Sequence, residues 1–370
     1  MKGLKILVSK YKNSPKKKKF SILVILALFI LASGFLGYFV AFNLHGLNKA
    51  LSPSANIISG DPREPRNFPN PINGILYTAS EASVWKDKLP LAVVIENHLD
   101  ARPQSGFAKA DLVYEALAEG GITRCLAIYL AEDSKLGPVR SNRPYFLDWV
   151  SEYSAGYAHV GGSPKAQSLI KPYRIKDLDQ FGLGVPTYER SSARFAPHNV
   201  YTTTKKLRSA AASRGYKGGV DIGIWKFSDD EASPSARPKK FELKIPYPAF
   251  GMDVLWKYDR STNTYLRFNA SKAHKDAEGG KQLFAKTVIV QSVITSLEGS
   301  GSGRLKMKTI GSGKAQIFKD GMIVSGTWKK SDRKGRTKFF DSKGDEVALN
   351  RGKIWVEVVP TYIKVVVSKK

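Results

Sequence analysis

The pattern of apolar and polar positions divides the chain into a membrane segment, a spacer and two folded regions. Residues 21–42 carry no charge over about twenty positions, and at about 1.5 Å of rise per helical residue they span a hydrocarbon core of roughly 30 Å. We therefore predict a transmembrane helix over 21–43. Residues 44–73 are rich in Pro, Asn and Ser, a composition that cannot build a core, so they are predicted to form a spacer.

Short apolar runs alternate with helix-like segments over 74–227, which is typical of an α/β layer structure. Residues 110–121 are predicted to form a helix, because their apolar positions recur every three or four residues and two glycines follow. Ser163 followed by Pro164 predicts another helix start. The other predicted elements of this region are strands at 89–97, 123–131 and 156–162 and a helix at 145–153.

A polar, proline-bearing linker at 228–240 predicts a domain boundary, and the pattern beyond it changes to strands and turns. Asp320 and Gly321 lie between two apolar runs and give the strongest hairpin signal in the chain. VLWKYDRSTNTYLRF predicts a further hairpin, and KTVIVQSVI predicts an apolar strand. Residues 241–370 are therefore predicted to form a smaller, mostly β domain. The predicted fold class is α+β or α/β, preceded by a transmembrane helix.

The distribution of charge changes the meaning of the basic composition. The formal net charge is +27, which on its own favours a nucleic-acid partner. Eight of those charges are lysines within the first nineteen residues, and 27 − 8 leaves +19 for the rest of the chain. Residues 1–20 are therefore interpreted as a cytoplasmic leader that orients the membrane helix and places the C-terminal regions outside the cytoplasm. No nucleic-acid partner is predicted.

A cleaved signal peptide is the alternative to an uncleaved anchor, because Ala32, Ser33 and Gly34 are small. The apolar run continues to Phe42, which is longer than the usual core of a signal peptide, so the anchor is favoured. The single cysteine, Cys125, lies in an apolar strand and is interpreted as core packing. No cysteine follows the apolar run, so a lipid cannot be attached to a cysteine there.

Long segments in both regions are distinctive: ARPQSGFAKADLVYEALAEGGITR, GPVRSNRPYFLDW, AHVGGSP, APHNVY, IGSGKAQIFKDGMIVSGTWKK and TKFFDSKGDEVALNRGKIWVEVVP. In these segments the chain resembles the YerB-like family, a two-domain bacterial family of unknown function. The resemblance covers about 89–360. It implies an N-terminal α/β domain, a smaller C-terminal domain and attachment to the outer face of a bacterial membrane, but no established activity. Its members are commonly described as lipoproteins, whereas here Phe35 follows Gly34 in place of an acylatable cysteine.

Ionisable residues of the first region gather at the ends of predicted strands. The crevice beyond the carboxyl ends of strands binds ligands in open α/β sheets, so these residues are expected to converge. Arg140 and Arg143 are candidates for a two-pronged clamp on a carboxylate or phosphate. The alternative is that they form structural ion pairs with Glu115, Glu119 or Asp148. The predicted ligand-binding residues are Arg102, Arg124, Arg140, Arg143, Arg194, His198 and Asn199.

Acid/base chemistry is the second hypothesis for the same region. Glu96 or Glu119, together with His159, would act as the acid and base on a cell-wall polymer. No His, Asp or Glu spacing is diagnostic of a metal, although His98 with Asp100 or His159 stays an open pairing. No metal and no cofactor is therefore predicted.

Taken together, these patterns predict a single-pass protein of the bacterial cytoplasmic membrane whose folded domains lie in the cell envelope, outside the cytoplasm. The preferred function is binding of an anionic or glycan-like ligand, such as a cell-wall polymer, in a cleft lined by Arg, Glu and His. The alternative is an envelope enzyme, so enzymatic activity stays open. The lipid bilayer is the predicted partner of residues 21–43, and no protein partner is identified.

Overall fold

The computed structural model describes residue 15 and residues 63–219, 222–230, 233–299 and 301–369. Residues 58–370 form one compact unit. The membrane helix predicted at 21–43 lies outside the described residues, as does nearly all of the leader and most of the spacer, so these stay predictions. Within the described residues, no helix combines the length and the apolar character needed to cross a membrane.

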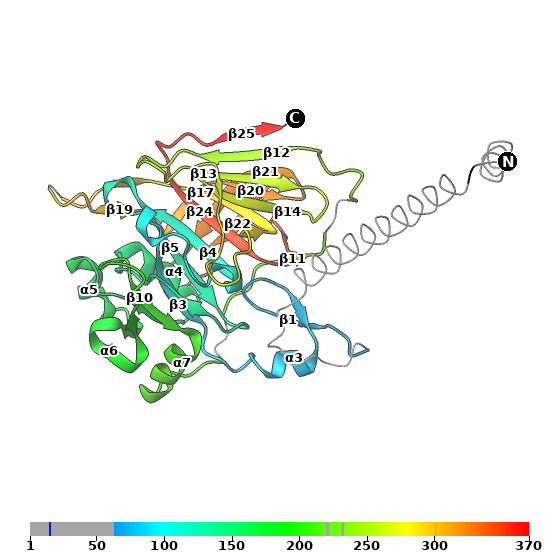
Figure 1. The fold of residues 1–370 in the computed structure, drawn as a ribbon. Helices are drawn as coiled ribbons and strands as arrows, with labels where there is room; N and C mark the ends of the chain where they lie inside the picture. Colours follow the sequence, from blue (N-terminus) through cyan, green and yellow to red (C-terminus); the bar gives the residue numbers. More distant parts are fainter. Residues whose placement is uncertain (1–14, 16–62, 220–221, 231–232, 300, 370) are drawn as a thin grey trace. The chain divides into compact units, whose positions relative to one another are not determined.

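One large sheet forms the centre of the compact unit (Figure 1). Within the described residues it has ten strands, in the order β22-β21-β20-β17-β24-β4-β5-β3-β7-β8. Their bounds are β22 Lys338–Asp341, β21 Met322–Lys330, β20 Gly311–Lys319, β17 Thr287–Val293, β24 Ile354–Pro360, β4 Leu112–Leu117, β5 Thr123–Tyr129, β3 Leu91–Glu96, β7 Gly156–His159 and β8 Lys176–Asp179. Strands β24, β4 and β3 are buried along their whole length, which explains their almost unbroken apolar sequences.

Strand β24 joins the two predicted regions. It runs parallel to β17 on one side and parallel to β4 on the other, where Glu357 lies opposite Glu115. The predicted linker at 228–240 therefore lies between two regions that both supply strands to the large sheet. The described fold is mostly β, with few helices, which corrects the α/β layers predicted for the first region.

A second sheet packs against the large one. Its strand order is β15-β14-β13-β12-β25, and β16 also pairs with β14. The bounds are β12 Phe241–Ile245, β13 Val254–Asp259, β14 Thr264–Asn269, β15 Lys272–Ala273, β16 Phe284–Ala285 and β25 Val366–Lys369. Ring centroids of Phe241 and Phe318 lie 5.6 Å apart, and those of Trp256 and Trp355 lie 5.4 Å apart. These aromatic contacts add to the apolar burial between the two sheets.

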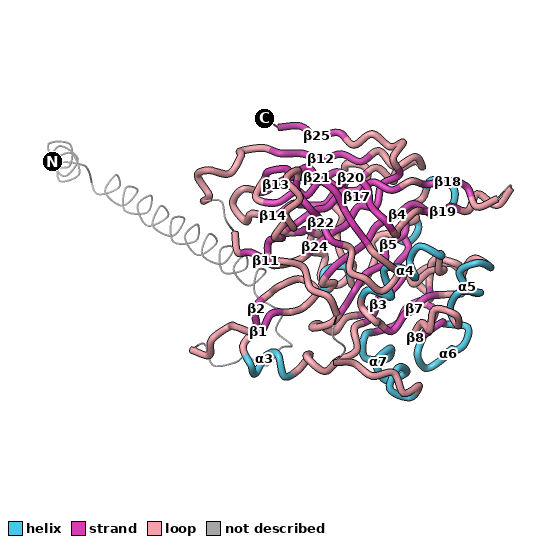
Figure 2. The backbone as a smooth tube through the Cα atoms, turned by 180° about the vertical axis from the view of Figure 1, so that it is seen from behind, coloured by secondary structure: helices cyan, strands magenta, loops and turns pink. Residues whose placement is uncertain are grey.

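The longer helices gather beside the β3, β7 and β8 part of the large sheet (Figure 2). Their bounds are α4 Pro144–Glu152, α5 Pro164–Ile170, α6 Gln180–Thr187 and α7 Thr204–Ser213, and the shorter α3, Ala79–Ser83, follows β2 and lies beside it. Helix α4 matches the predicted helix at 145–153. Ser163 Oγ accepts the Ala166 N–H at 3.3 Å and Pro164 occupies the first turn of α5, which confirms the predicted start of this helix.

Short strand pairs complete the described fold: β1 Phe68–Pro69 with β2 Leu76–Tyr77, β10 Val200–Thr203 with β6 Lys135–Leu136 and β9 Glu189–Arg190, β11 Phe227–Ser228 with β23 Leu349–Asn350, and β18 Thr295–Leu297 with β19 Leu305–Met307. Strand β1 falls in the predicted spacer. Beside it, Asn70 and Asn73 each donate a side-chain hydrogen bond to Asp111 Oδ1, at 2.9 and 2.7 Å. The folded unit therefore includes the C-terminal end of the predicted spacer.

The helix predicted at 110–121 is wrong. This segment forms strand β4 and then a short turn at Glu119–Gly121. Every β4 residue is buried: β5 and β24 pair with its two edges, Tyr114 stacks on Trp149 of α4, and Glu115 pairs with Arg267 of the second sheet. A strand that is buried on both faces needs no alternation of apolar and polar residues, so its sequence can also match a helical spacing.

Local turn chemistry predicts both hairpins correctly. Asp320 and Gly321 have φ values of 52° and 69° and connect β20 to β21. Asn263 has a φ of 52° in the turn between β13 and β14. Positive φ is tolerated by Gly, Asn and Asp, which is why these residues identify the turns in the sequence.

Candidate functional site

Glu96 is the last residue of β3 and lies where three chain segments meet. Its backbone N–H donates to Pro138 O at 2.9 Å, which holds the following loop against the end of the strand. Its Oε1 accepts from Arg140 Nε at 2.9 Å, and its Oε2 lies 3.0 Å from His198 Nδ1. The Glu96 side chain is only 5% exposed, so these two partners replace water as its hydrogen-bond donors.

His98, Asp100 and His198 form a second group beside Glu96. His98 caps the short turn η1 (Leu99–Ala101), and its Nδ1 accepts the Asp100 N–H at 3.2 Å. The imidazole rings of His98 and His198 are stacked, with centroids 4.7 Å apart and planes at 17°. Asp100 Oδ2 lies 3.4 Å from His98 Nδ1 and 3.9 Å from His198 Nε2. All three side chains are partly exposed, so solutes can reach the group.

Arg194 holds the loop that carries His198 in place. Its guanidinium donates to Asp100 O and, at 2.8 Å, to Pro103 O. These bonds fasten the loop to the segment around η1, so that His198 reaches His98 although the two residues are far apart in sequence. Asn199 makes hydrogen bonds within the same loop. Arg194 and Asn199 therefore contact the protein itself, where the sequence predicts contacts with a ligand.

Glu119, Arg143 and Arg124 form an ion group at the turn that follows β4. Arg143 Nε and Nη2 donate to the two Glu119 oxygens at 2.6 Å each, which makes a bidentate pair. Burial raises the pKa of Glu119, but the hydrogen bonds and charge of Arg143 outweigh it and hold that pKa below its usual range. Arg124 Nη2 lies 3.8 Å from Glu119 Oε2. Burial, and then the charge of Arg143, lowers the pKa of Arg124 to about 10.

The two candidate clamp residues face different carboxylates. Arg140 pairs with Glu96, and Arg143 pairs with Glu119. Arg124 lies directly opposite Glu96 in the β3–β5 pairing, so both ion groups sit at the same end of neighbouring strands. Within the described residues, the ion group at Glu119 holds two guanidiniums and one carboxylate, which leaves a surplus of positive charge there, whereas Asp100 adds a second carboxylate near Glu96.

His159 is separate from both ion groups. Its side chain is fully buried, with Nδ1 at 2.8 Å from Gly161 O and Nε2 at 2.9 Å from Asp177 Oδ1. Asp179 Oδ1 lies 3.4 Å from Nδ1. Within the described residues, these partners occupy both ring nitrogens, and no polar contact joins His159 to Glu96 or to the other candidate glutamate. The predicted acid/base pairing is therefore not formed in the structure.

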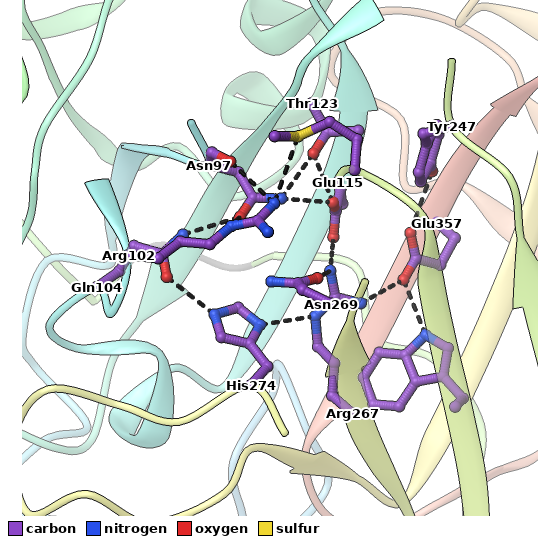
Figure 3. A network of polar contacts seen from close by, with 12 residues as sticks. Asn97, Arg102, Gln104, Glu115, Thr123, Tyr247, Arg267, Asn269, His274 and Glu357 are labelled. Carbon is purple, nitrogen blue, oxygen red and sulfur yellow. Dashed lines mark hydrogen bonds and ion pairs between the residues drawn. The ribbon is translucent and has the colours of Figure 1, made fainter. Parts of the chain in front are cut away.

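A buried polar network that the sequence analysis missed lies between the two sheets (Figure 3). Arg267 of β14 donates from Nη2 to Glu115 Oε2 at 2.5 Å and from Nη1 to Glu357 Oε1 at 3.0 Å. All three side chains are 0% exposed. The rings of Trp256 and Trp355 flank the guanidinium at 5.1 and 4.3 Å. Burial, and then the charge of Glu115, raises the pKa of Glu357 to about 8.

Arg102 extends this network toward the end of β3 (Figure 3). Its Nε donates to Asn97 Oδ1 at 3.0 Å, and its Nη1 donates to Gly251 O at 2.8 Å. Burial lowers its pKa to about 10. Arg102 thus supports the chain beneath the site. A single charged residue inside an apolar strand, as in KIWVEVVP, is the sequence signal that points to such a network.

A hollow of about 530 Å³ is lined by none of the predicted ligand-binding residues. Its lining residues are Pro234, Ser235, Lys239, Tyr258, Asp259, Arg260 and Ser261. The Asp259 carboxylate accepts from the Ser261 hydroxyl, and Arg260 donates to the carbonyl groups of Pro234 and Ser235. Since these polar groups satisfy one another, we take the ion groups near Glu96, and not this hollow, as the candidate site.

Two family models match the chain. Residues 77–217 match "Protein of unknown function (DUF3048) N-terminal domain", and residues 243–356 match "Protein of unknown function (DUF3048) C-terminal domain". The chain belongs to the DUF3048 family. The two DUF3048 segments lie on either side of the predicted linker, and strands from both build the large sheet.

The relatives of this DUF3048 chain agree with the predicted YerB-like resemblance. "Putative lipoprotein YerB" of Bacillus subtilis (strain 168) is 29% identical over 287 residues, which is 76% of this chain and 85% of that protein. The crystal structure of YerB protein from Bacillus subtilis matches with a TM-score of 0.74 at 28% identity, over 82% of this chain and 100% of that one. The resemblance predicted from the motifs is confirmed.

Proposed function

We propose that this DUF3048 protein works in the bacterial cell envelope, outside the cytoplasm, and binds an anionic, glycan-like polymer there. The location is supported by the similarity to "Putative lipoprotein YerB" of Bacillus subtilis, since lipoproteins are a membrane-attached class of protein. The predicted lysine-rich leader and apolar segment point to the same side of the membrane, with a protein helix in place of a lipid.

The surplus of guanidinium groups at Arg124 and Arg143 over the single carboxylate of Glu119 is the observation that carries the binding proposal. Arg143 is paired with Glu119 at hydrogen-bond distance. Within the described residues, the hydrogen bonding of Arg124 is limited to a carbonyl at 3.3 Å, and its ion pair is long at 3.8 Å. The Arg124 side chain is 13% exposed, and we propose that its remaining N–H groups donate to a phosphate or carboxylate.

The neighbouring groups suit a glycan-like polymer. The imidazoles of His98 and His198 are partly exposed and can accept or donate hydrogen bonds to sugar hydroxyl groups. A cation surplus next to such groups favours a polymer that carries both anionic groups and hydroxyls. The envelope enzyme is not proposed, because His159 is buried in contacts of its own.

Polymer binding by the full chain in nonionic detergent tests the proposal. Labelled poly(glycerol phosphate) is titrated into wild type, Arg124→Gln and Arg351→Gln, with neutral dextran as the comparison polymer. Arg351 pairs with Asp229 at 3.0 Å and is the matched control for the loss of one charge. Since a hydrogen bond to a charged group contributes about 1.5–3 kcal/mol, we expect Arg124→Gln to weaken binding roughly tenfold or more.

The Arg351→Gln control distinguishes binding at a specific site from general attraction of the polymer to a basic protein. Arg351→Gln should bind the polymer as wild type does. Equal affinity for wild type and Arg124→Gln, or an equal loss in both variants, contradicts the proposal, because either result shows that only net charge matters. Far-UV circular dichroism confirms that both variants are folded.

A further inference from the structure

His98, Asp100 and His198 bring three potential metal ligands together at the rim of the candidate site. One ligand atom from each residue lies within 4.8 Å of the other two. Two imidazoles and a carboxylate are donors that suit zinc and related divalent ions, and in catalytic zinc sites three protein ligands of these types leave one position open. The tautomers of both histidines and the distances between ligand atoms decide whether this group can bind a metal.

The hydrogen bond at His98 fixes its tautomer. A backbone N–H can only donate, and that of Asp100 points at His98 Nδ1 at 3.2 Å. Nδ1 must therefore carry a lone pair and no proton. Asp100 Oδ2 lies 3.4 Å from the same nitrogen, so an unprotonated nitrogen and a carboxylate oxygen face one another. A cation that both can bind stabilises two acceptors at this distance; an ion bound at Nδ1 takes its single lone pair and therefore replaces the hydrogen bond from the Asp100 N–H.

The tautomer of His198 follows from Glu96 in the same way. Glu96 accepts from Arg140 with one oxygen, and its other oxygen faces His198 Nδ1 at 3.0 Å. Nδ1 therefore carries the proton and donates it, which leaves the lone pair of the neutral ring on Nε2. This nitrogen faces Asp100 Oδ2 at 3.9 Å. A carboxylate behind a ligating histidine is the usual outer-shell support of a metal site.

The distances between the ligand atoms are close to those around a bound zinc ion. Bonds of about 2.0–2.1 Å to a tetrahedral zinc ion separate two ligand atoms by roughly 3.4 Å. The separations from Asp100 Oδ2 are 3.4 and 3.9 Å, so a small rotation of one side chain closes the set. Asp100 is 70% exposed and is free to make this adjustment.

We propose that His98, Asp100 and His198 bind one divalent ion of the zinc class, with Glu96 as the outer-shell partner of His198. The ion has an open position for water or for an oxygen of a ligand. The exclusively oxygen-based sites that suit Ca²⁺ and Mg²⁺ differ from this donor set, so these ions are not expected to compete. The proposal stands apart from polymer binding, since Zn²⁺ alone is its probe.

Equilibrium dialysis of the full chain against Zn²⁺ tests the site. The protein is kept in nonionic detergent and stripped with EDTA, and bound metal is measured by mass spectrometry for wild type, Asp100→Asn, His198→Gln and Glu96→Gln. Wild type should hold one ion more per chain than Asp100→Asn. Glu96→Gln should weaken binding about 10- to 100-fold, which is typical of an outer-shell change. The two ligand variants should lose more than that, and excess Mg²⁺ should not displace the ion.

Asp177→Asn is the matched control, because Asp177 pairs with His159 at 2.9 Å, outside the proposed site. It should bind Zn²⁺ as wild type does. The visible absorption band of the Co²⁺-loaded protein gives a second readout, and this band should be absent in Asp100→Asn. The proposal is overturned if wild type holds no more Zn²⁺ than Asp100→Asn, or if Asp177→Asn loses the ion equally. Asp100→Asn decides the result even if His198→Gln fails to fold, because Asp100 is exposed.

Discussion

Replacing Arg267 with methionine removes the positive charge that two buried glutamates share. Glu115 and Glu357 lie within 2.5 and 3.0 Å of its guanidinium, and the three side chains are 0% exposed. Removing one partner of a buried ion pair costs about 3–5 kcal/mol, because an uncompensated charge stays in the core. Here two carboxyl groups remain, of which Glu357 can hold a proton below its raised pKa of about 8, and the contacts with the rings of Trp256 and Trp355 are lost as well. We therefore expect Arg267→Met to lower the free energy of unfolding by at least about 3 kcal/mol, a large part of the roughly 5–15 kcal/mol typical of a folded protein.

Urea unfolding of the compact unit 58–370, followed by tryptophan fluorescence and circular dichroism, measures this loss. The triple variant Arg267→Met, Glu115→Gln, Glu357→Gln removes the guanidinium and both ionisable carboxyl groups and keeps similar volumes. It should recover most of the lost free energy, because buried ion networks can be replaced by neutral groups at little cost. Arg333→Met is the control, since Arg333 is partly exposed, stacks on Tyr173 and donates one hydrogen bond to the Ser151 hydroxyl, so its loss should change stability by only about 1 kcal/mol. A loss in Arg267→Met no larger than in this control, or a triple variant no better than the single one, refutes the reasoning.

Two further predictions follow from the same structure. The pKa of Glu357 is raised from 4.5 to about 8, so between these values the folded protein keeps a proton that the unfolded chain has released. The free energy of unfolding should therefore fall as pH rises through this window. Glu357→Gln should reduce that fall, as measured by urea midpoints at about pH 5 and about pH 9. Identical pH dependence in both proteins would count against it. A Cβ at Gly326 would lie 1.8 Å from Phe340 O, so Gly326→Ala should destabilise the β21–β22 pairing by about 1–3 kcal/mol in thermal unfolding, whereas Gly182→Ala, which meets open space, should not.

Local chemistry in the sequence predicts those parts of the fold that depend on neighbouring residues. The hairpin at Asp320-Gly321 and the start of α5 at Ser163 are correct because turn and cap geometry involve only a few adjacent positions. The identity of β4 depends on β24, which pairs with it from far along the chain. No local pattern contains that pairing, so the segment is wrongly predicted as a helix.

The candidate site is also predictable only where neighbouring residues determine it. The end of β3 at Glu96 and the loop with Arg140 are predictable, because strand ends are visible in the apolar pattern. The meeting of His98 with His198 depends on how Arg194 fastens a distant loop, and this information is absent from the spacing of histidines. Opposite charges also pair according to distance in space, which is why Arg140 and Arg143 have different partners.

The position of β24 has a consequence for how a growing chain can fold. Its residues 354–360 fill the gap between β17 and β4, yet they are made after both neighbours. Until then, two apolar strands present open edges, which are templates for pairing with other chains. The N-terminal segment therefore cannot complete its own sheet during synthesis, and such non-local pairing slows folding. A chain cut short before residue 354 should accordingly aggregate, even though the sequence before the cut is intact.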